Sequence, residues 1–419
     1  MSIPQTKHSL YICYFGLREP LVQTQVIPYL REILKDKIKI SLLTFEPNFK
    51  DSWNAGEIEA ARGKLAEEGI SWHCLSYHKR PSVPATIFDI FNGAYFAARL
   101  SRREKIDVFH ARAHVAALMG AIAKTFSGGK VLFDIRGFLP EEYTDAGIWK
   151  ENGLIYRSVK RIEKWLLKKS DGFVVLTEKA RAILFPESLE TGFDKLGRPV
   201  EVIPCCVDIG GRFKGVGVEM RAEMRQKLNL DDRFVMVYVG AFGGWYLTEE
   251  TADLFAELKK KRNDAFAMIL TQSQPEIMGR LLLGRGYKSD DFLITQVSPA
   301  EIPQYLSAAD VAVSFIKPCY SKLASSPTKN AEYLACGLPI ITNGGVGDVE
   351  SLIERREVGV LVRNFEVTDY INALTVIDGL SISGELCKNV AVSEFDLVRI
   401  GGKRYRRLYA CLLESGDFS

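Results

Sequence analysis

Short β-rich runs alternate with helical patterns along almost the whole chain, and this rhythm limits the fold more than any other feature of the sequence. Strands separated by helices build parallel sheets with helices on both faces. The sequence therefore predicts an α/β protein with two Rossmann-like, doubly wound parallel sheets. The predicted strands are residues 9–15, 38–45, 71–77, 107–111, 130–135, 172–177 and 200–205 in the first half, and 234–240, 266–271, 292–296, 311–316, 339–343 and 358–362 in the second.

The length of 419 residues exceeds what one hydrophobic core usually supports and favours two domains. A Gly-rich, aperiodic stretch at residues 208–218 is predicted to join them. We place one domain at residues 1–210 and the second at 211–395, and we expect the amphipathic helix of residues 396–419 to pack back on the first. Ligands of such sheets bind beyond the carboxyl ends of the strands, so we expect a deep cleft between two facing sheets.

Composition and charge exclude several classes of function. The formal net charge of +3 provides no strongly basic face for nucleic acid. The eight cysteines lack the spacing of a zinc site, so no metal is expected. No run approaches the roughly 20 apolar residues of a spanning helix, and the first residues do not resemble a signal peptide. We expect a cytoplasmic protein, and a place at the inner face of the membrane stays open.

The segment SSPTKNAEYLACGLP, residues 325–339, lies between two predicted strands. Pro327 at a first helical position and Ser326 as a cap predict that a helix begins here. A helix N-terminus offers N–H groups and a partial positive charge to an anion, and Lys329 adds a full charge. The segment therefore predicts a diphosphate site. The alternative is an ordinary well-capped helix start.

Glu332 lies one turn beyond Thr328, where its carboxylate can accept hydrogen bonds from a ribose diol; a solvated helix face is the alternative. The whole segment resembles the donor-binding segment of family-4 glycosyltransferases, which have the GT-B fold. The resemblance implies that the backbone N–H groups of Thr328 and Lys329 contact the α-phosphate of the donor. Of the family's two glutamates, spaced eight residues apart, Glu332 matches the ribose-binding second one, whereas Ala324 replaces the sugar-binding first one.

A second resemblance lies in YVGAFGGWYLTEE, residues 238–250, where a predicted strand meets a helix. Gly243 and Gly244 let the backbone approach a ligand closely, although a plain βα turn would also contain such glycines. In many family members this loop carries an arginine and, five residues later, a lysine, which together hold the diphosphate. This chain has Ala241 and Tyr246 at those positions.

Positive charge for the leaving diphosphate is then expected from Lys329 and Arg136, which we predict to be the catalytic residues. Arg136 follows a predicted strand in the segment DIRGF, which resembles the Asp-x-Arg-Gly-Phe segment of a subgroup of the same family. Many relatives carry a histidine there, beside the transferred sugar. Asp134 shares the face of the strand and is expected to orient Arg136.

The loop after the first strand resembles the donor/acceptor loop of that subgroup. Gly16 suits the close approach of a sugar, and Gln23, Thr24 and Gln25 are candidates for hydrogen bonds to acceptor hydroxyls, with a plain surface loop as the alternative. His110 is a further candidate for sugar contact, although histidines in such places are more often packed in the core.

These resemblances imply a retaining, metal-independent glycosyltransferase without a cofactor. It would move a sugar from a nucleotide-diphosphate sugar to a saccharide, lipid-linked or small-molecule hydroxyl, in polysaccharide or glycoconjugate biosynthesis. The basic helix of residues 160–172, which contains Trp165 and Leu166, leaves a peripheral membrane contact open. Two other functions also stay open: a nucleotide-sugar epimerase or hydrolase of the same fold, and a non-catalytic donor-binding subunit.

Overall fold

The computed structural model describes residues 6–379 and 382–414. The chain forms two compact units: unit 1 comprises Met1–Pro204 and Gly401–Ser419, and unit 2 comprises Cys205–Ile400. The sequence predicts the boundary at residue 210 and the start of the returning helix at about residue 396. In the structure the chain leaves unit 1 after Pro204 and returns to it at Gly401.

Unit 1 is built on a seven-stranded sheet in the order β3-β2-β1-β4-β5-β6-β7, and all of its neighbouring strands are parallel. The strand order reverses between β1 and β4, so the carboxyl ends of these two strands flank a topological switch point. All six residues of β1 are buried, as expected for a strand covered by helices on both faces. The strands are β1 (His8–Cys13), β2 (Lys39–Pro47), β3 (Ile70–Tyr77), β4 (Val108–Arg112), β5 (Lys130–Asp134), β6 (Gly172–Val175) and β7 (Val200–Val202).

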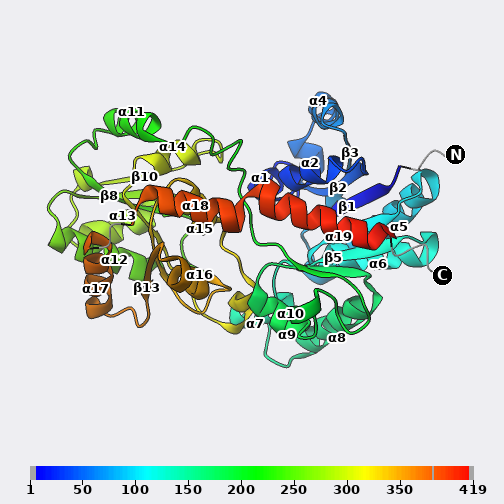
Figure 1. The fold of residues 1–419 in the computed structure, drawn as a ribbon. Helices are drawn as coiled ribbons and strands as arrows, with labels where there is room; N and C mark the ends of the chain where they lie inside the picture. The colour runs from blue at the N-terminus through cyan, green and yellow to red at the C-terminus, as the bar shows by residue number, and fades with distance from the viewer. Residues whose placement is uncertain (1–5, 380–381, 415–419) are drawn as a thin grey trace. The chain divides into compact units, whose positions relative to one another are not determined.

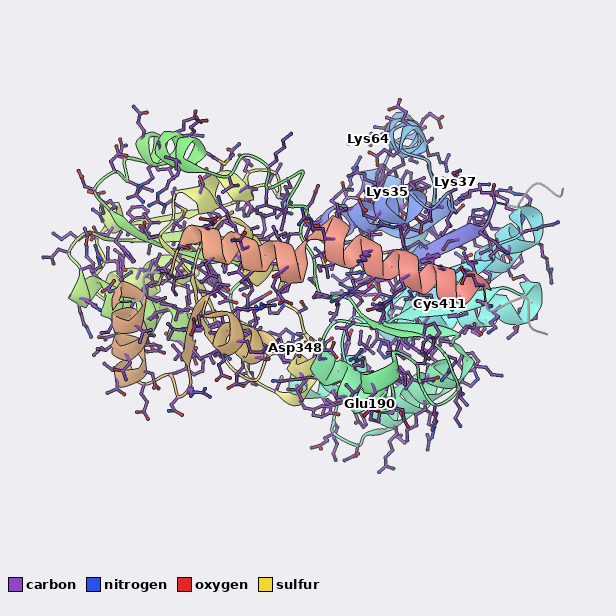
Figure 2. The ribbon with its side chains drawn as sticks, in the orientation of Figure 1. Lys35, Lys37, Lys64, Glu190, Asp348 and Cys411 are labelled. Carbon is purple, nitrogen blue, oxygen red and sulfur yellow. The ribbon has the colours of Figure 1, made fainter. Side chains whose placement is uncertain are left out.

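The helices of unit 1 cover this sheet and turn charged residues to the outside. Lys35, Lys37 and Lys64 are exposed on this unit (Figure 2). The helix α4 begins at a capping box, in which Asn54 and Glu57 each accept the other's backbone N–H. The helices are α1 (Pro20–Gln25), α2 (Ile27–Leu34), α3 (Phe49–Ser52), α4 (Ala55–Glu67), α5 (Ser82–Glu104), α6 (Ala113–Ser127), α7 (Leu139–Asp145), α8 (Leu154–Lys169), α9 (Glu178–Leu184), α10 (Ser188–Thr191) and α19 (Lys403–Glu414).

The helix α19 brings the end of the described chain back to the start of unit 1. Its red ribbon lies beside the blue strands in Figure 1. Its side chains Tyr405 and Tyr409 are buried against unit 1, and the Tyr409 hydroxyl lies 2.7 Å from Oγ of Ser9 in β1. The Arg404 guanidinium donates to the Val202 carbonyl at 2.6 Å. The helix thus fastens both β1 and β7, and residues 415–419 of the predicted helix lie outside the described residues.

Unit 2 has a six-stranded parallel sheet in the order β10-β9-β8-β11-β12-β13. The order reverses between β8 and β11. The strands are β8 (Phe234–Val239), β9 (Ala265–Leu270), β10 (Phe292–Thr295), β11 (Val311–Ser314), β12 (Ile340–Asn343) and β13 (Gly359–Val362). The helices are α11 (Val218–Leu228), α12 (Thr248–Lys261), α13 (Pro275–Gly284), α14 (Ile302–Ser307), α15 (Thr328–Ala335), α16 (Val349–Arg356), α17 (Val367–Gly379) and α18 (Gly384–Phe395), with short turns η1 (Ser289–Asp291), η2 (Tyr320–Ala324) and η3 (Leu397–Gly402).

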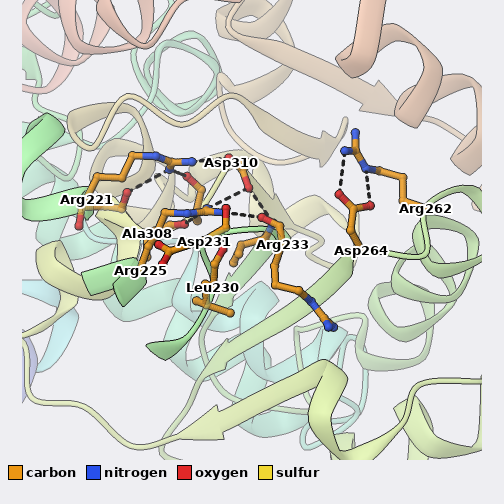
Figure 3. A network of polar contacts seen from close by, with 12 residues as sticks. Arg221, Arg225, Leu230, Asp231, Arg233, Arg262, Asp264, Ala308 and Asp310 are labelled. Atoms are coloured by element: carbon orange, nitrogen blue, oxygen red, sulfur yellow. Dashed lines mark hydrogen bonds and ion pairs between the residues drawn. The ribbon is translucent and has the colours of Figure 1, made fainter. Parts of the chain in front are cut away.

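An arginine–aspartate network holds α11 against the amino ends of β8 and β11 (Figure 3). Arg221 pairs with Asp310 at 2.5 Å, and Arg225 donates to the Ala308 carbonyl at 2.8 Å. The same aspartate accepts the backbone N–H of Val235 at 2.7 Å. These arginines thus form ion pairs and hydrogen bonds within unit 2, at the edge of the sheet opposite the carboxyl ends of the strands.

Two doubly wound parallel sheets are present, so the predicted fold class is confirmed. None of the helices among the described residues is long and apolar enough to span a bilayer.

Candidate functional site

The predicted donor segment of unit 2 lies at the carboxyl ends of β8 and β11, where the strand order reverses. The helix α15 begins at Thr328, and Pro327 occupies the N-cap position without a side-chain cap. Ser326 therefore stands one residue too early to cap the helix, and that prediction is wrong. Its Oγ instead accepts the backbone N–H of Cys205 at 3.1 Å. The first-turn N–H groups of α15 thus lack a side-chain acceptor from the N-cap residue.

Lys329 is buried in the first turn of α15, with 8% of its surface exposed. Its Nζ has no hydrogen-bond partner among the described residues. The ammonium lies 4.3 Å from the ring centroid of Tyr246 and 4.6 Å from that of Tyr238. Burial lowers the pKa of Lys329 to about 7, against the attraction of Glu332. A buried cation without a hydrogen-bond partner among the described residues is costly, and an anionic ligand would offset this cost.

The loop between β8 and α12 approaches this lysine at its first residue. A Cβ at Gly240 would lie 3.1 Å from both Nζ of Lys329 and the Tyr238 hydroxyl, so these groups would have to shift slightly, and the φ of 149° also favours glycine there. Gly243 and Gly244 are exposed, with φ angles of 70° and 60°, and an added Cβ would meet nothing within 4 Å. These two glycines serve the left-handed turn. Close approach of a ligand to Gly243 and Gly244 stays a prediction. The close contact with Lys329 is at Gly240, which directly follows the strand and was not singled out from the sequence.

Glu332 is buried, which excludes the alternative of a solvated helix face. It forms an ion pair with Arg212, whose guanidinium also lies 4.6 Å from the ring centroid of Phe213. Burial raises the pKa of Glu332, and Arg212 works in the opposite direction. Arg212 comes from the Gly-rich segment that the sequence analysis treated as a linker, and no local signal marked it.

In unit 1, the loop after β1 is held by a buried carboxylate. A Cβ at Gly16 would lie 2.8 Å from Cδ of Pro47 and 2.9 Å from Oε2 of Glu46, so the close approach at this glycine is to the chain itself. Glu46 accepts hydrogen bonds from the Leu17 backbone N–H at 2.9 Å and from the Trp53 indole at 3.1 Å. Burial raises the pKa of Glu46. Contact of Gly16 with a sugar stays a prediction.

The polar residues of α1 are partly engaged by nearby backbone. Gln23 Nε2 donates to the Leu17 carbonyl at 2.6 Å, and Thr24 Oγ1 donates to the carbonyl one turn earlier at 2.8 Å. Gln25 is buried, and its own carbonyl accepts from Arg112 at 3.4 Å. Hydrogen bonds from these three side chains to an acceptor stay a prediction.

Asp134, at the end of β5, is the centre of a buried polar cluster. Its carboxylate lies 3.4 Å from Nη1 of Arg136 and 3.8 Å from both Arg112 Nη1 and His110 Nε2. The Tyr405 hydroxyl donates to it at 3.1 Å. Burial alone would raise the pKa of Asp134, but the neighbouring cations hold it well below its usual range. The 3.4 Å contact between Asp134 and Arg136 is the ion pair through which Asp134 was expected to orient this arginine.

His110 lies fully buried inside this cluster. Its Nδ1 is 3.0 Å from the Tyr409 hydroxyl, and its ring centroid is 4.3 Å from that of Tyr11. Burial lowers its pKa, which favours the neutral imidazole. This geometry fits a packed core histidine and does not favour direct contact with a sugar.

The helix α8 contains most of the basic segment that left a membrane contact open. Leu166 is fully buried and Trp165 is partly buried, while Lys164 and Lys168 are exposed. The apolar residues named for this contact therefore face the interior of unit 1. Among the described residues, no three or more His, Cys, Asp or Glu side chains are grouped as metal ligands.

Two family models match the chain. The model of Glycosyltransferase Family 4 matches residues 58–210, and that of Glycosyl transferases group 1 matches residues 220–377. The two ranges do not overlap, and together they take in most of the chain. The chain belongs to the group 1 glycosyltransferase family. The donor segment around Lys329 and Glu332 lies within the second range, and the Asp134 cluster lies largely within the first.

Solved structures of this glycosyltransferase fold are similar over nearly the full length. HepE from Anabaena in complex with UDP is 16% identical, with a TM-score of 0.66 over 98% of this chain and 100% of that one; another structure of HepE contains UDP-glucose. Sucrose-phosphate synthase from Thermosynechococcus elongatus is 16% identical, with a TM-score of 0.71 over 98% and 100%. A UDP-N-acetylglucosamine 2-epimerase is 9% identical, with a TM-score of 0.60 over 99% and 98%. At these identities the similarity shows the fold, and a comparison with curated protein sequences finds no match.

Proposed function

We propose that this glycosyltransferase transfers a sugar from a UDP-sugar with retention of configuration, and that Lys329 neutralises the leaving diphosphate. The observation that carries the proposal is the buried Lys329 ammonium, which has no hydrogen-bond partner among the described residues and stands at the N-terminus of α15. Helix N-termini and buried cations together bind phosphate. The HepE complexes with UDP and UDP-glucose support uridine as the base of the donor.

Lys329 also accounts for the missing diphosphate pair. Where many relatives carry an arginine and a lysine, this chain has Ala241 and Tyr246. The Lys329 ammonium lies 4.3 Å from the Tyr246 ring, at the loop that would otherwise supply the lysine. The positive charge is thus supplied from α15, and Gly240 leaves the space for it.

The ribose is assigned to Glu332. Its carboxylate lies one turn beyond Thr328 on the same helix, and Arg212 favours its ionised form. An ionised carboxylate accepts hydrogen bonds from both hydroxyls of a vicinal diol.

Retention is proposed to follow from attack on the face of the sugar that the diphosphate leaves. The acceptor oxygen bonds to the anomeric carbon while the bond to the diphosphate breaks, and a diphosphate oxygen takes the acceptor proton. The protein then serves mainly to position groups and to stabilise negative charge, without a metal. In unit 1, Arg136, held by Asp134, is the second proposed source of positive charge.

The acceptor is proposed to be a saccharide or a lipid-linked saccharide, handled by the residues of the Gly16–Gln25 loop. This assignment rests on the resemblance of that loop. We further propose a role in polysaccharide or glycoconjugate biosynthesis in the cytoplasm.

The donor assignment is tested by thermal shift with UDP, GDP, ADP, CMP and their sugar conjugates. Stabilisation by UDP and a UDP-sugar is expected in the wild type and should disappear in Glu332→Ala, because the ribose contact is lost. Stabilisation by another nucleotide would replace uridine in the proposal, and no stabilisation by any of them would remove the donor site.

The role of Lys329 is tested by turnover. Lys329→Ala is expected to lower turnover by about 10²–10³, because one charged group that stabilises the leaving diphosphate is lost. Lys317→Ala, which removes an exposed lysine from the loop after β11, is the matched control and should keep wild-type turnover. Wild-type turnover in Lys329→Ala would remove this residue from the mechanism.

Two other functions remain as outcomes of the same assay. The similarity to a UDP-N-acetylglucosamine 2-epimerase favours an epimerase or hydrolase as the second candidate. Conversion of the UDP-sugar without an acceptor would identify that activity. Binding of a UDP-sugar with neither conversion nor transfer would identify a non-catalytic donor-binding subunit.

A further inference from the structure

The outer face of α5 carries large apolar side chains that no part of unit 1 covers. Phe88, Phe91 and Tyr95 are 57%, 62% and 67% exposed. Ile87 and Val83, about one and two turns before Phe91, are also about half exposed. Their spacing of three and four residues places all five on one side of the helix. The stripe belongs to unit 1 and shares no residue with the donor segment of unit 2, so a role for it does not depend on the proposed donor site.

The other side of α5 is tightly packed, so the exposed stripe belongs to a firmly seated helix. α5 lies along α6 (Figure 1). At their contact, a Cβ at Gly93 would lie 2.6 Å from Sδ of Met119 and 2.9 Å from the Phe45 ring. Ala94 and Ala97 on the same side are buried. A small rotation of α5 therefore cannot bury the aromatic stripe.

Phe126, near the end of α6, extends the apolar area. It is 64% exposed, and its carbonyl accepts a hydrogen bond from Arg102 of α5 at 3.3 Å. This contact places Phe126 beside the C-terminal part of the stripe. We refer to these residues together as the α5 surface: Val83, Ile87, Phe88, Phe91, Tyr95 and Phe126.

The exposed charges around the α5 surface are positive. The two carboxylates of α5 are both engaged: Asp89 is fully buried and accepts hydrogen bonds from the Tyr14 hydroxyl and the His78 backbone, and Glu104 pairs with Lys39 at 2.9 Å. The helix therefore exposes cations at both ends and aromatic rings between them. The exposed cations are Lys79 and Arg80 before the helix, and Arg99 and Arg102 in its last turns; Arg103 is also exposed but pairs with Glu104 at 2.7 Å.

We propose that the α5 surface docks on an anionic lipid bilayer, with α5 lying in the plane of the headgroups. Aromatic rings favour the boundary between headgroups and acyl chains. Lysine and arginine side chains reach from such a helix to anionic headgroups. A helix of 23 residues is about 34 Å long and presents the stripe along the surface without crossing it.

Charge favours the lipid surface over a second copy of this chain. In a two-fold interface the α5 surfaces of the two copies would face each other. The exposed cations at the two ends of α5 would then face the same part of the chain in the other copy, which carries no exposed acid to pair with them. An anionic headgroup layer complements these cations along the whole helix.

The proposal is tested by flotation of the full chain with vesicles of phosphatidylcholine alone and of phosphatidylcholine mixed with phosphatidylglycerol. Binding to the anionic vesicles is expected, and it should weaken with salt because part of the attraction is electrostatic. The double variant Phe91→Glu with Tyr95→Glu should bind at least about tenfold more weakly, because both substitutions put charge into the apolar contact. Arg80→Gln and Arg99→Gln should each weaken binding about fivefold.

The matched control is Val367→Glu with Ile371→Glu, which places the same charges, also four residues apart, on exposed apolar residues of α17 in unit 2. This variant should bind as the wild type does. Unchanged thermal unfolding of both double variants will show that they are folded, since all four positions are exposed.

Three outcomes would overturn the proposal. The first is no flotation with either vesicle, and the second is equal flotation of the Phe91→Glu, Tyr95→Glu variant and the wild type. The third is a wild-type dimer, detected by light scattering, that this variant converts to a monomer; it would assign the α5 surface to a second copy of the chain.

Discussion

Two buried charged residues, one in each unit, show opposite surroundings. Asp134 in unit 1 is enclosed by Arg136, Arg112, His110 and the Tyr405 hydroxyl. Lys329 in unit 2 meets aromatic rings, and its Nζ has no hydrogen-bond partner among the described residues. The first charge is satisfied by the protein itself, and the second is left for something else to satisfy.

The difference appears in the pKa values. Both groups lose hydration through burial, which disfavours the charged form. At Asp134 the partners outweigh this loss and the pKa is held below its usual range. At Lys329 they do not, and the pKa falls to about 7. A paired buried charge of this kind holds the fold together, whereas an unpaired one marks a place where a ligand of opposite charge would bind.

The largest expected effect is on the stability of unit 1. Asp134→Asn should lower the free energy of unfolding by about 3–5 kcal/mol, because the buried Arg112 and the partly buried Arg136 lose the negative charge beside them. Chemical denaturation measures this change. The control Glu68→Gln removes the partner of Arg31 at the surface and should cost no more than about 1 kcal/mol. A loss as small as that of the control would show that the Asp134 cluster does not stabilise unit 1.

Replacement of Lys329 should change the free energy of unfolding in the opposite direction. Lys329→Met should raise the free energy of unfolding at pH 6 by about 1–4 kcal/mol, because it removes a desolvated cation that has no hydrogen-bond partner among the described residues. In the wild type the folded-state pKa is about 7 and lies below the ordinary value of 10.5, so the unfolded chain binds the proton more tightly.

The charged Lys329 therefore lowers the free energy of unfolding by its full amount below pH 7. This loss becomes smaller as the pH rises from 7 towards 10.5, because the folded protein then holds the lysine neutral. The advantage of Lys329→Met over the wild type should shrink across the same range. A variant that is less stable than the wild type at pH 6 would show that the aromatic rings compensate the charge fully.

The fold was largely predictable because its signal is local. Each predicted strand is present, since continuous apolar runs between helical patterns are typical of parallel sheets. The last strand of unit 1 is shorter than predicted: β7 ends at Val202, because Pro204 lacks the N–H that would continue the ladder and the chain leaves unit 1 there.

The site was only partly predictable. Thr328, Lys329 and Glu332 lie on one helix, so their relation follows from helical spacing. The partners that set their charge lie far away in sequence: Arg212 is 120 residues from Glu332, and Tyr405 is 271 residues from Asp134. Such contacts depend on how the helices pack, which no local pattern reports.

Donor affinity should depend on pH with the sign set by Lys329. The diphosphate favours the protonated ammonium and raises its pKa, so binding above pH 7 takes up a proton. The affinity for UDP-glucose should be flat below pH 7 and then fall by up to about tenfold per pH unit. Calorimetry in two buffers of different ionisation enthalpy measures the proton uptake directly. Lys329→Met should bind more weakly at pH 6 and should take up no proton on binding above pH 7; uptake in that variant would assign the proton to another group.

The smallest effect tests the aromatic partner of the cation. Tyr246→Leu removes the ring that lies 4.3 Å from Nζ of Lys329, a contact worth about 0.5–1 kcal/mol to the protonated form. The pKa of Lys329 should fall further, and the pH at which donor affinity begins to drop should move down by about half a unit. Phe242→Leu is the control, because its ring stacks on Tyr238 at 6.1 Å and so reaches the ammonium only through that second ring. An unchanged pH profile in Tyr246→Leu would mean that burial alone sets the charge of Lys329, and the comparison with Asp134 would then rest on desolvation without any contribution from the rings.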